Sequence, residues 1–488
     1  MSTLFVVGKI NRTEVTQSLA TVCDHHIQLP DLAALFIRLY SDRLVGRSHE
    51  EGVSLVVHPG NAAESAELDS TFRAFFPVLN LVAIDQHVAA ERLRELVTQL
   101  PAQNKRCRDR VRRMAHWMYH SGCSSRVYSI ARQLHTLRGT AQRRTVPPVL
   151  AAIDFASLLT RCDDARYWRL LSTWNFEPHT LLRSDLVWCA FVLLRKLAAD
   201  AHLQLPDQRL LLFLFTLEAS YHQVNKFHNF RHAVDVMQAT WRLCDTILQQ
   251  PLQVLLLSVA AIGHDIGHPG SNNMLLTKFR APVAMRYQES VLENMHSDLF
   301  RQLLNDQWPQ LLGQSHNTNN LISDTIKATD MALHAEYVDK LRENRKIDNL
   351  KTLTSLIIKA ADISNVTRPL KISAQWAYLI TLEFRDCSLL EEYKSARDDE
   401  SENESEGNSD DDESARDSGD GARVEDILEV ALSPEELVKK YPCIPGGQIF
   451  FIDTFAEQFF EEFCQKFPEL NFLMENIRSN KKFWLGKL

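Results

Sequence analysis

Glycine and proline are scarce in this chain of 488 residues, which has only 16 glycines and 17 prolines. Because both residues favour turns, their scarcity argues against a turn-rich β fold and favours long helices. The nine cysteines show no CxxC spacing, so we expect reduced thiols rather than a disulfide framework. Reduced thiols are typical of a protein of the cytoplasm, or of the cytoplasm and nucleus, and we expect that location here. Long apolar runs are missing too, since the longest, 210–215 and 254–263, fall short of the ~18 residues of a membrane helix. The first residues, MSTLFVVGKINRTE, predict no secretory signal, and we expect no membrane partner.

A strong charge of one sign is also lacking outside one segment. The formal net charge is −8, yet residues 398–420 alone carry 12 acidic residues against one arginine. The rest of the chain is therefore close to neutral and creates no general field that would attract nucleic acid, so we expect no nucleic-acid partner. Since the acidic segment also lacks core-forming residues, we expect a disordered insert at about 393–425.

The chain divides into three regions by pattern. In residues 1–90, short aliphatic runs at 4–8, 53–58 and 79–84 alternate with helical patterns at 31–44 and 65–76, an order that predicts a small parallel α/β unit of unknown role. Residues 91–184 are expected to be a helical connecting region. Residues 185–488 are expected to form a helical domain, which resumes after the insert at an S-P-x-E capping box that begins at Ser433. The fold class is therefore mainly α.

Histidines and carboxylates gather in four short motifs of the helical domain: FHNFRHAVDVMQ, AAIGHDIGHPGSNN, VLENMH and KAADISNVTRPL. Asp265 and Asp362 each end an apolar run, where a carboxylate is costly unless it is paired or bound to a cation. Imidazole suits Zn²⁺, and carboxylate also suits the harder Mg²⁺ or Mn²⁺. Together with His232 and His264 these residues supply one closed ligand set, and Asp265 has a second oxygen for another metal. Such a pair of metals can clamp a phosphoryl oxygen, which favours phosphoester hydrolysis.

The bland alternative is that each of these residues, taken alone, is a satisfied core residue. The HxxxH spacing is a weak signal, and it also predicts that His228 and His232 share one helical face. A third such pair, His116 and His120 in HWMYH, has no acidic partner nearby and is interpreted as ordinary helix residues. The metal interpretation therefore depends on the set as a whole.

In their order and amino-acid sequence, the motifs resemble those of the class I 3′,5′-cyclic nucleotide phosphodiesterases over about residues 185–480. The resemblance rests on YHxxxxxHNxxHA, GHDxxHPGxxN, VLEN, ATDM, ADxSN and a late GQ, and it is greatest for the high-affinity fungal cyclic-AMP enzymes. It implies an all-helical, HD-type catalytic domain that hydrolyses 3′,5′-cyclic AMP to 5′-AMP and so lowers cyclic-AMP signalling.

The resemblance also implies a role for each matching residue. The implied tight zinc ligands are His232, His264, Asp265 and Asp362, and Asp265 also reaches a second metal, Mg²⁺ or Mn²⁺. His228 would protonate the leaving 3′ oxygen. The residues implied around the second metal and the phosphate are His268, Glu293, His296 and Asp330. The residues implied to bind the base are Asn365, Ile380, Gln448 and Phe451, in which the Gln448 amide meets the purine edge and the Phe451 ring stacks on the base.

The match has two departures, and two other functions stay open. Gly267 stands where many relatives have a second aspartate, and Met295 stands where a histidine is common. One alternative is another HD-type phosphohydrolase that acts on nucleoside phosphates; the other is a catalytically inactive cyclic-nucleotide sensor. HNxxHA and the late Gln448 favour the phosphodiesterase, and the complete metal set argues against an inactive protein. The sequence leaves the oligomeric state open.

Overall fold

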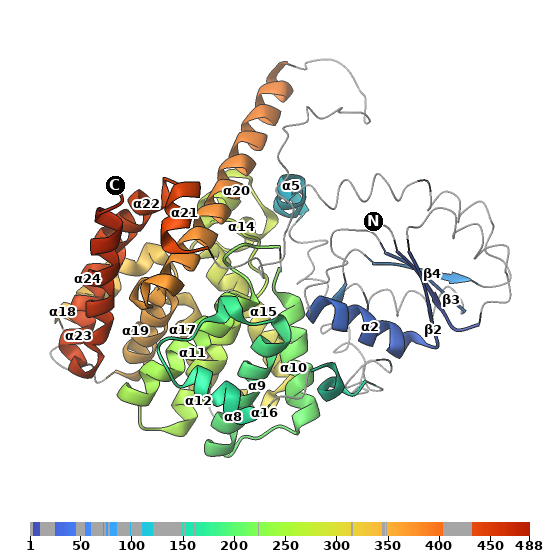
Figure 1. Ribbon diagram of the computed structural model, residues 1–488, viewed down its shortest axis with the longest axis horizontal. Helices are drawn as coiled ribbons and strands as arrows, with labels where there is room; N and C mark the ends of the chain where they lie inside the picture. The colour runs from blue at the N-terminus through green and yellow to red at the C-terminus, as the bar shows by residue number, and fades with distance from the viewer. Residues whose placement is uncertain are drawn as a thin grey trace.

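The structure, a computed structural model, consists of a small α/β unit and a large helical body (Figure 1). It describes residues 3–9, 25–44, 54–59, 72, 75–76, 79–84, 98, 110–120, 149, 153–159, 163–222, 224–313, 316–343, 347, 349–403 and 432–488. Most of the predicted helix at 65–76 and the acidic segment from 404 to 431 lie outside the described residues.

The N-terminal unit contains a parallel sheet of four strands in the order β2-β1-β3-β4. The strands are β1 (Thr3–Val7), β2 (His25–Leu29), β3 (Ser54–Pro59) and β4 (Leu79–Ile84), with α2 (Leu32–Leu44) after β2. The predicted parallel α/β unit is therefore confirmed, but the sequence analysis missed β2. Its sequence, HHIQL, has only two aliphatic residues, Ile27 and Leu29, and they are not adjacent. The strand lies partly exposed at the edge of the sheet, so it does not need the continuous aliphatic run of a buried strand.

The helical body confirms the mainly α prediction. Its helices are α5 (Arg110–His120), α8 (Asp164–Leu171), α9 (Arg183–Asp200), α10 (Asp207–Ser220), α11 (Phe230–Ile247), α12 (Pro251–Gly263), α13 (Asn273–Lys278), α14 (Pro282–Arg286), α15 (Val291–Gln307), α16 (Pro309–Leu312), α17 (His316–Lys327), α18 (His334–Glu343), α19 (Leu350–Asp362), α20 (Leu370–Asn403), α21 (Pro434–Lys440), α22 (Ile444–Phe451), α23 (Glu457–Lys466) and α24 (Phe472–Leu485). None of the helices that the structure describes is both long and apolar enough to cross a bilayer.

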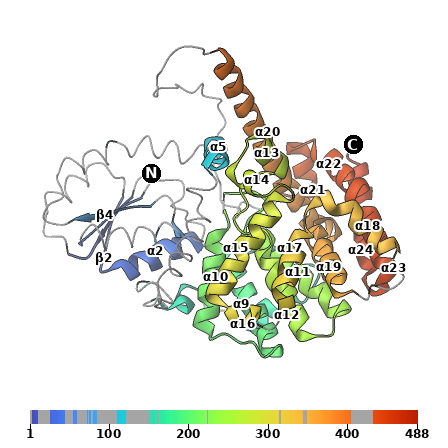
Figure 2. The same cartoon turned by 180° about the vertical axis from the view of Figure 1, so that it is seen from behind.

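Helix α12 is enclosed by other helices of the body, with α11, α9, α17 and α19 packed against it (Figure 2). Its sequence PLQVLLLSVAAIG is apolar on all faces, and every residue from Leu255 to Gly263 is buried. A helix that is apolar all round is stable only when neighbours cover it on every side. The polar residues that follow α12 are therefore carried into the interior.

Two predicted boundaries differ from the structure. The body begins before residue 185, because Tyr167 on α8 donates a hydrogen bond to Asp185 on α9 (2.6 Å). Helix α20 continues to Asn403, so residues 393–403 of the expected insert are helical. The chain there has no glycine or proline to end the helix, and Lys394 pairs with Asp398 one turn later (2.8 Å). The helix at Ser433 begins with the capping box that the sequence predicted.

Candidate active site

Asn229 decides how the first motif is built. Its side chain is the N-cap of α11 and accepts hydrogen bonds from the backbone N–H groups of Arg231 (2.9 Å) and His232 (3.4 Å). Helix α11 therefore begins at Phe230, so His232 lies in its first turn and His228 lies before the helix. The prediction that the two histidines share one helical face is wrong, because the helix starts only at the capping residue between them, after His228.

His232, His264 and Asp362 meet in one group. A ligand atom from each lies within 4.8 Å of the others, although they come from the start of α11, the residue after α12 and the last residue of α19. Asp362 Oδ1 lies 3.1 Å from His232 Nε2 and 3.3 Å from His264 Nε2. Asp265 joins them, since its Oδ2 lies 3.2 Å from His264 Nε2 and 3.6 Å from His232 Nε2.

The nitrogen and oxygen atoms of this group are suited to bind a cation. His264 donates Nδ1–H to the carbonyl oxygen of Ala261 (2.7 Å), so in the neutral ring its Nε2 carries a lone pair. That nitrogen is buried and faces two carboxylate oxygens without hydrogen-bond geometry to either. Acceptors that converge in this way need a positive charge between them, and a divalent metal supplies it with ligands of the preferred types.

The second oxygen of Asp265 points to another part of the site. His296 donates Nδ1–H to the carbonyl oxygen of Ile266 (2.7 Å). Its buried Nε2 has no hydrogen-bond partner among the described residues and lies 3.8 Å from Asp265 Oδ1. Burial lowers the pKa of His296 to about 4, so this ring is neutral. Asp265 therefore lies between two ring nitrogens that can both serve as ligands.

Both carboxylates of the group are held ionised. Burial alone would raise the pKa of Asp362, but its hydrogen bond to His232 and the electrostatic attraction of His264 hold it below its ordinary range. For Asp265 the attraction of the neighbouring histidines, His264 above all, likewise outweighs burial and lowers the pKa. Ionised carboxylates are the form that binds a metal.

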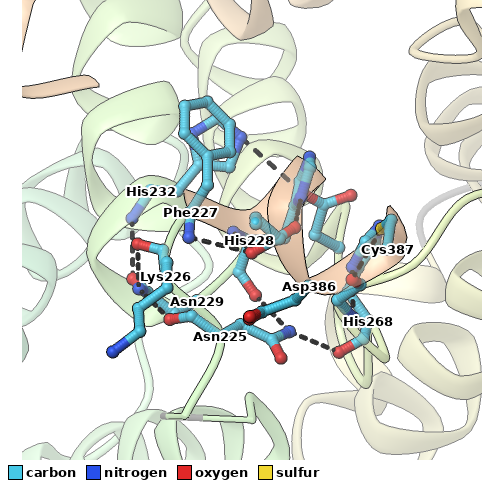
Figure 3. A network of polar contacts seen from close by, with 12 residues as sticks. Asn225, Lys226, Phe227, His228, Asn229, His232, His268, Asp386 and Cys387 are labelled. Carbon is cyan, nitrogen blue, oxygen red and sulfur yellow. Dashed lines mark hydrogen bonds and ion pairs between the residues drawn. The ribbon is translucent and has the colours of Figure 1, made fainter. Parts of the chain in front are cut away.

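A second group consists of His228, His268 and Glu383. His228 Nδ1 forms a short contact with the Glu383 carboxylate, whose other oxygen accepts backbone N–H bonds from Phe227 (2.9 Å) and His228 (3.2 Å). The His228 ring stacks on that of His268, with centroids 4.0 Å apart. Figure 3 shows His228, His268 and Asn225 in one network, with a dashed line between Asn225 and His268.

This environment keeps His228 protonated. Burial disfavours the imidazolium, but the attraction of Glu383 and its hydrogen bond prevail and raise the pKa of His228 to about 9. The same pairing lowers the pKa of Glu383 to about 2 against the opposing effect of its burial. The His228 side chain is 25% exposed, against 1% for His264, so it can reach a molecule in the site. A protonated, reachable imidazole is suited to be a general acid.

Glu383 is the functional residue that the sequence analysis missed. It lies on α20 four residues after Leu379 and seven after Trp376, on the face that packs into an apolar cluster. A carboxylate at such a position is costly unless it is paired. Asp265 and Asp362 were predicted to belong to the site because each is a carboxylate next to an apolar run. Glu383 is a carboxylate in a comparable apolar setting and could have been predicted in the same way.

The remaining residues of the expected metal and phosphate set lie around Asp265. His268 accepts a hydrogen bond at Nδ1 from the Gly270 N–H (3.0 Å), and burial together with the charge of His228 lowers the pKa of His268. Burial, followed by repulsion from Asp330, raises the pKa of Glu293 to about 7. Asp330 accepts a hydrogen bond from Ser290 (2.6 Å).

The residues expected to bind a base come from three other elements. Ile380 packs beside Phe227 and Trp376, whose rings lie against His232. Asn365 lies in the short helix after Asp362, and its side-chain oxygen is buried without a hydrogen-bond partner among the described residues. Gln448 and Phe451 both lie on α22, which packs on α20; Gln448 is buried and Phe451 half-buried.

Comparison with known proteins places these features in one family. A family model described as 3′,5′-cyclic nucleotide phosphodiesterase matches residues 227–403. The 3′,5′-cyclic-nucleotide phosphodiesterase 2 of Saccharomyces cerevisiae is 43% identical over 99% of both chains. The 3′,5′-cyclic-AMP phosphodiesterase, isoform F, of Drosophila melanogaster is 30% identical over 44% of this chain and 37% of its own length. The crystal structure of yeast caPDE2 in complex with IBMX aligns with the present structure over 100% of both chains, with 26% sequence identity and a TM-score of 0.74.

Proposed function

Because the chain belongs to the 3′,5′-cyclic nucleotide phosphodiesterase family, we propose that its substrate is 3′,5′-cyclic AMP and its product 5′-AMP. The observation that carries the proposal is the adjacency of the two groups: a cation site made by His232, His264 and Asp362 lies beside a protonated histidine that is partly exposed. One group can hold the phosphate and its attacking water, and the other can give a proton to the leaving oxygen.

We propose Zn²⁺ for the site of His232, His264, Asp265 and Asp362, because two imidazoles and two carboxylates suit that metal. The side of Asp265 that faces His296 suits the harder Mg²⁺ or Mn²⁺, with Glu293, Asp330 and His268 around it. When bound, the two cations would polarise the phosphoryl group and make an attacking water more acidic.

The protein side chains perform the remaining steps. Glu383 orients the His228 ring and keeps it charged, so that its outer nitrogen can hold a proton at the leaving 3′ oxygen. Gln448 meets the purine edge with its amide, and Phe451 and Ile380 lie on either face of the base. Asn365 offers its unpaired amide oxygen, an acceptor suited to the amino group of adenine.

The decisive experiment measures product release from cyclic AMP and cyclic GMP with Zn²⁺ and Mg²⁺ present. We expect 5′-AMP, not 3′-AMP, with slower turnover of cyclic GMP and loss of turnover after chelation. A His116→Ala variant should keep the full rate, since that exposed HxxxH pair has no carboxylate partner in the described residues. Release of phosphate from nucleoside monophosphates would instead support an HD-type phosphohydrolase. Binding of cyclic AMP without turnover would support an inactive sensor.

A further inference from the structure

Arg110 is the first residue of α5, and it lies far outside the residues that the family model matches. Helix α5 packs against α20 and stands beside it in both ribbon views (Figures 1 and 2). There Arg110 Nε forms a short ion pair with Asp386 Oδ2, and the two side chains are only 15% and 18% exposed. The guanidinium is therefore held in a fixed place by a residue three positions after Glu383.

The other end of the guanidinium faces Asn225, a residue that is 1% exposed. The amide nitrogen of Asn225 donates hydrogen bonds to the carbonyl oxygens of His228 (2.9 Å) and His268 (2.7 Å). Figure 3 draws the bond to His268 as a dashed line. Because both partners are acceptors, the amide cannot be flipped, and its oxygen must face a donor. Arg110 Nη2, at 3.4 Å from that oxygen, is the donor.

Gly270 makes room for this contact. Its φ of +78° lies in the left-handed region, and a Cβ atom built there would lie 2.7 Å from both Arg110 Nη2 and Asn225 Oδ1. Neither atom could stay in place beside a larger residue. The loop that carries His268, the loop that carries His228 and the start of α5 thus meet at one point.

We propose that Arg110 is a positioning residue for the general acid, an inference that rests on the proposed function. Its guanidinium, anchored by Asp386, fixes the Asn225 amide, and that amide fixes the backbone of His228 and His268. The Asn225 amide bonds directly to the backbone of His228 and His268, rather than to the tight-site ligands His232, His264 and Asp362. Loss of Arg110 should therefore impair protonation of the leaving oxygen more than metal binding or substrate binding.

The experiment compares two substrates in the full-length, metal-loaded protein. One is cyclic AMP; the other is its analogue with sulfur in place of the leaving 3′ oxygen, since a thiolate leaves without needing a proton. For Arg110→Met we expect kcat on cyclic AMP to fall by at least about 10-fold, with KM and zinc content unchanged, and to fall less than about 3-fold on the sulfur analogue. Arg110→Lys should show the same selectivity to a smaller degree, because one ammonium cannot span Asp386 and Asn225 together.

A matched control is Arg342→Met, which also breaks an ion pair between two distant helices, α18 and α23 (3.1 Å), but has no link to His228. It should keep both rates. The His228→Ala variant should show the same substrate selectivity as Arg110→Met. Equal losses on both substrates, or an unchanged rate on cyclic AMP, would overturn the inference. If Arg110→Met does not fold, Arg110→Lys decides by the same comparison. If the unmodified protein does not hydrolyse cyclic AMP, the proposed function itself fails, and the two failures are thus distinguishable.

Discussion

Individual histidines of the site differ in the partner of their Nδ1 atom. His264 and His296 donate Nδ1–H to backbone carbonyl oxygens, which leaves each Nε2 free to act as a ligand. His228 instead places Nδ1 against a carboxylate, which stabilises its protonated form. One type of side chain therefore serves as metal ligand in one place and as acid in another, according to its neighbour.

Substitution of His228 and of His232 should separate these two roles. We expect His228→Ala to keep its metal and to bind cyclic AMP, but to lose kcat by about 10²–10⁴-fold, because the leaving oxygen lacks its proton donor. We expect His232→Ala to lose metal, since it removes a ligand. Metal content by mass spectrometry and kcat should be measured for both. Metal loss in His228→Ala, or its full activity, would contradict the assignment.

The pH profile should report on Glu383. The acid form of His228 is required, so activity is present below its pKa and is lost as the pH rises through it. Because the Glu383 carboxylate raises that pKa, Glu383→Gln should move the alkaline limb of the kcat profile down by about 1–3 pH units. Glu391→Gln, which changes a half-buried glutamate on the same helix that pairs with Lys278, serves as the control and should leave the profile unchanged. An unshifted limb in Glu383→Gln would show that another group is the acid.

Helix ends, rather than helix middles, carry the group of His232, His264 and Asp362. Asn229 caps α11, His264 follows α12, and Asp362 is the last residue of α19. At a helix end the side chains are no longer enclosed by the helix's own neighbours, so residues from three helices can converge. Helix α22 contributes in another way, because it places Gln448 and Phe451 one turn apart.

Gln448→Ala tests the proposed role of α22. Loss of the amide would leave the polar edge of the bound purine without its partner, at a cost of about 1–3 kcal/mol. We therefore expect a KM for cyclic AMP about 5- to 150-fold higher, with unchanged metal content. Gln458→Ala, which removes an exposed amide from α23, should leave KM as it is. Equal KM values for Gln448→Ala and the parent would exclude purine recognition by Gln448.

At the scale of the whole molecule, the N-terminal unit is joined to the helical body through buried polar contacts. Tyr40 on α2 donates a hydrogen bond to Glu218 on α10 (2.5 Å), and Arg43 forms an ion pair with the same carboxylate (3.2 Å). Glu218 is fully buried and Arg43 nearly so. Helix α10 is followed in the chain by Tyr221 and the loop of His228. The N-terminal unit therefore contacts the helix that leads into the active site.

Arg43→Met should lower the free energy of unfolding markedly. The variant removes a buried cation from the Glu218 carboxylate, a change that costs about 3–5 kcal/mol in comparable sites. Lys196→Met is the control, because it breaks an exposed pair with Asp200 on α9 and should cost less than about 1 kcal/mol. Chemical denaturation of both variants gives the comparison. Equal stabilities would show that the N-terminal unit does not depend on this pair.

Much of this protein was determined by local sequence alone. The apolar run before His264, the capping box at Ser433 and the aliphatic strands of the N-terminal unit follow from short-range patterns, and the structure confirms them. The motifs around His232 and Asp362 also predicted the family, which the comparisons confirm. These features depend on residue type and spacing within one segment, so no distant contact is needed to infer them.

Other features were decided only by the tertiary structure. The polar, edge-lying β2 depends on its pairing with β1, a neighbour that a local pattern does not contain. The pairing of His228 with Glu383 spans 155 positions, and that of Arg110 with Asp386 spans 276. A charge is tolerated at a buried position only when its partner arrives there in the fold. Sequence can show that such a charge needs a partner, but only the packing of the helices shows which residue it is.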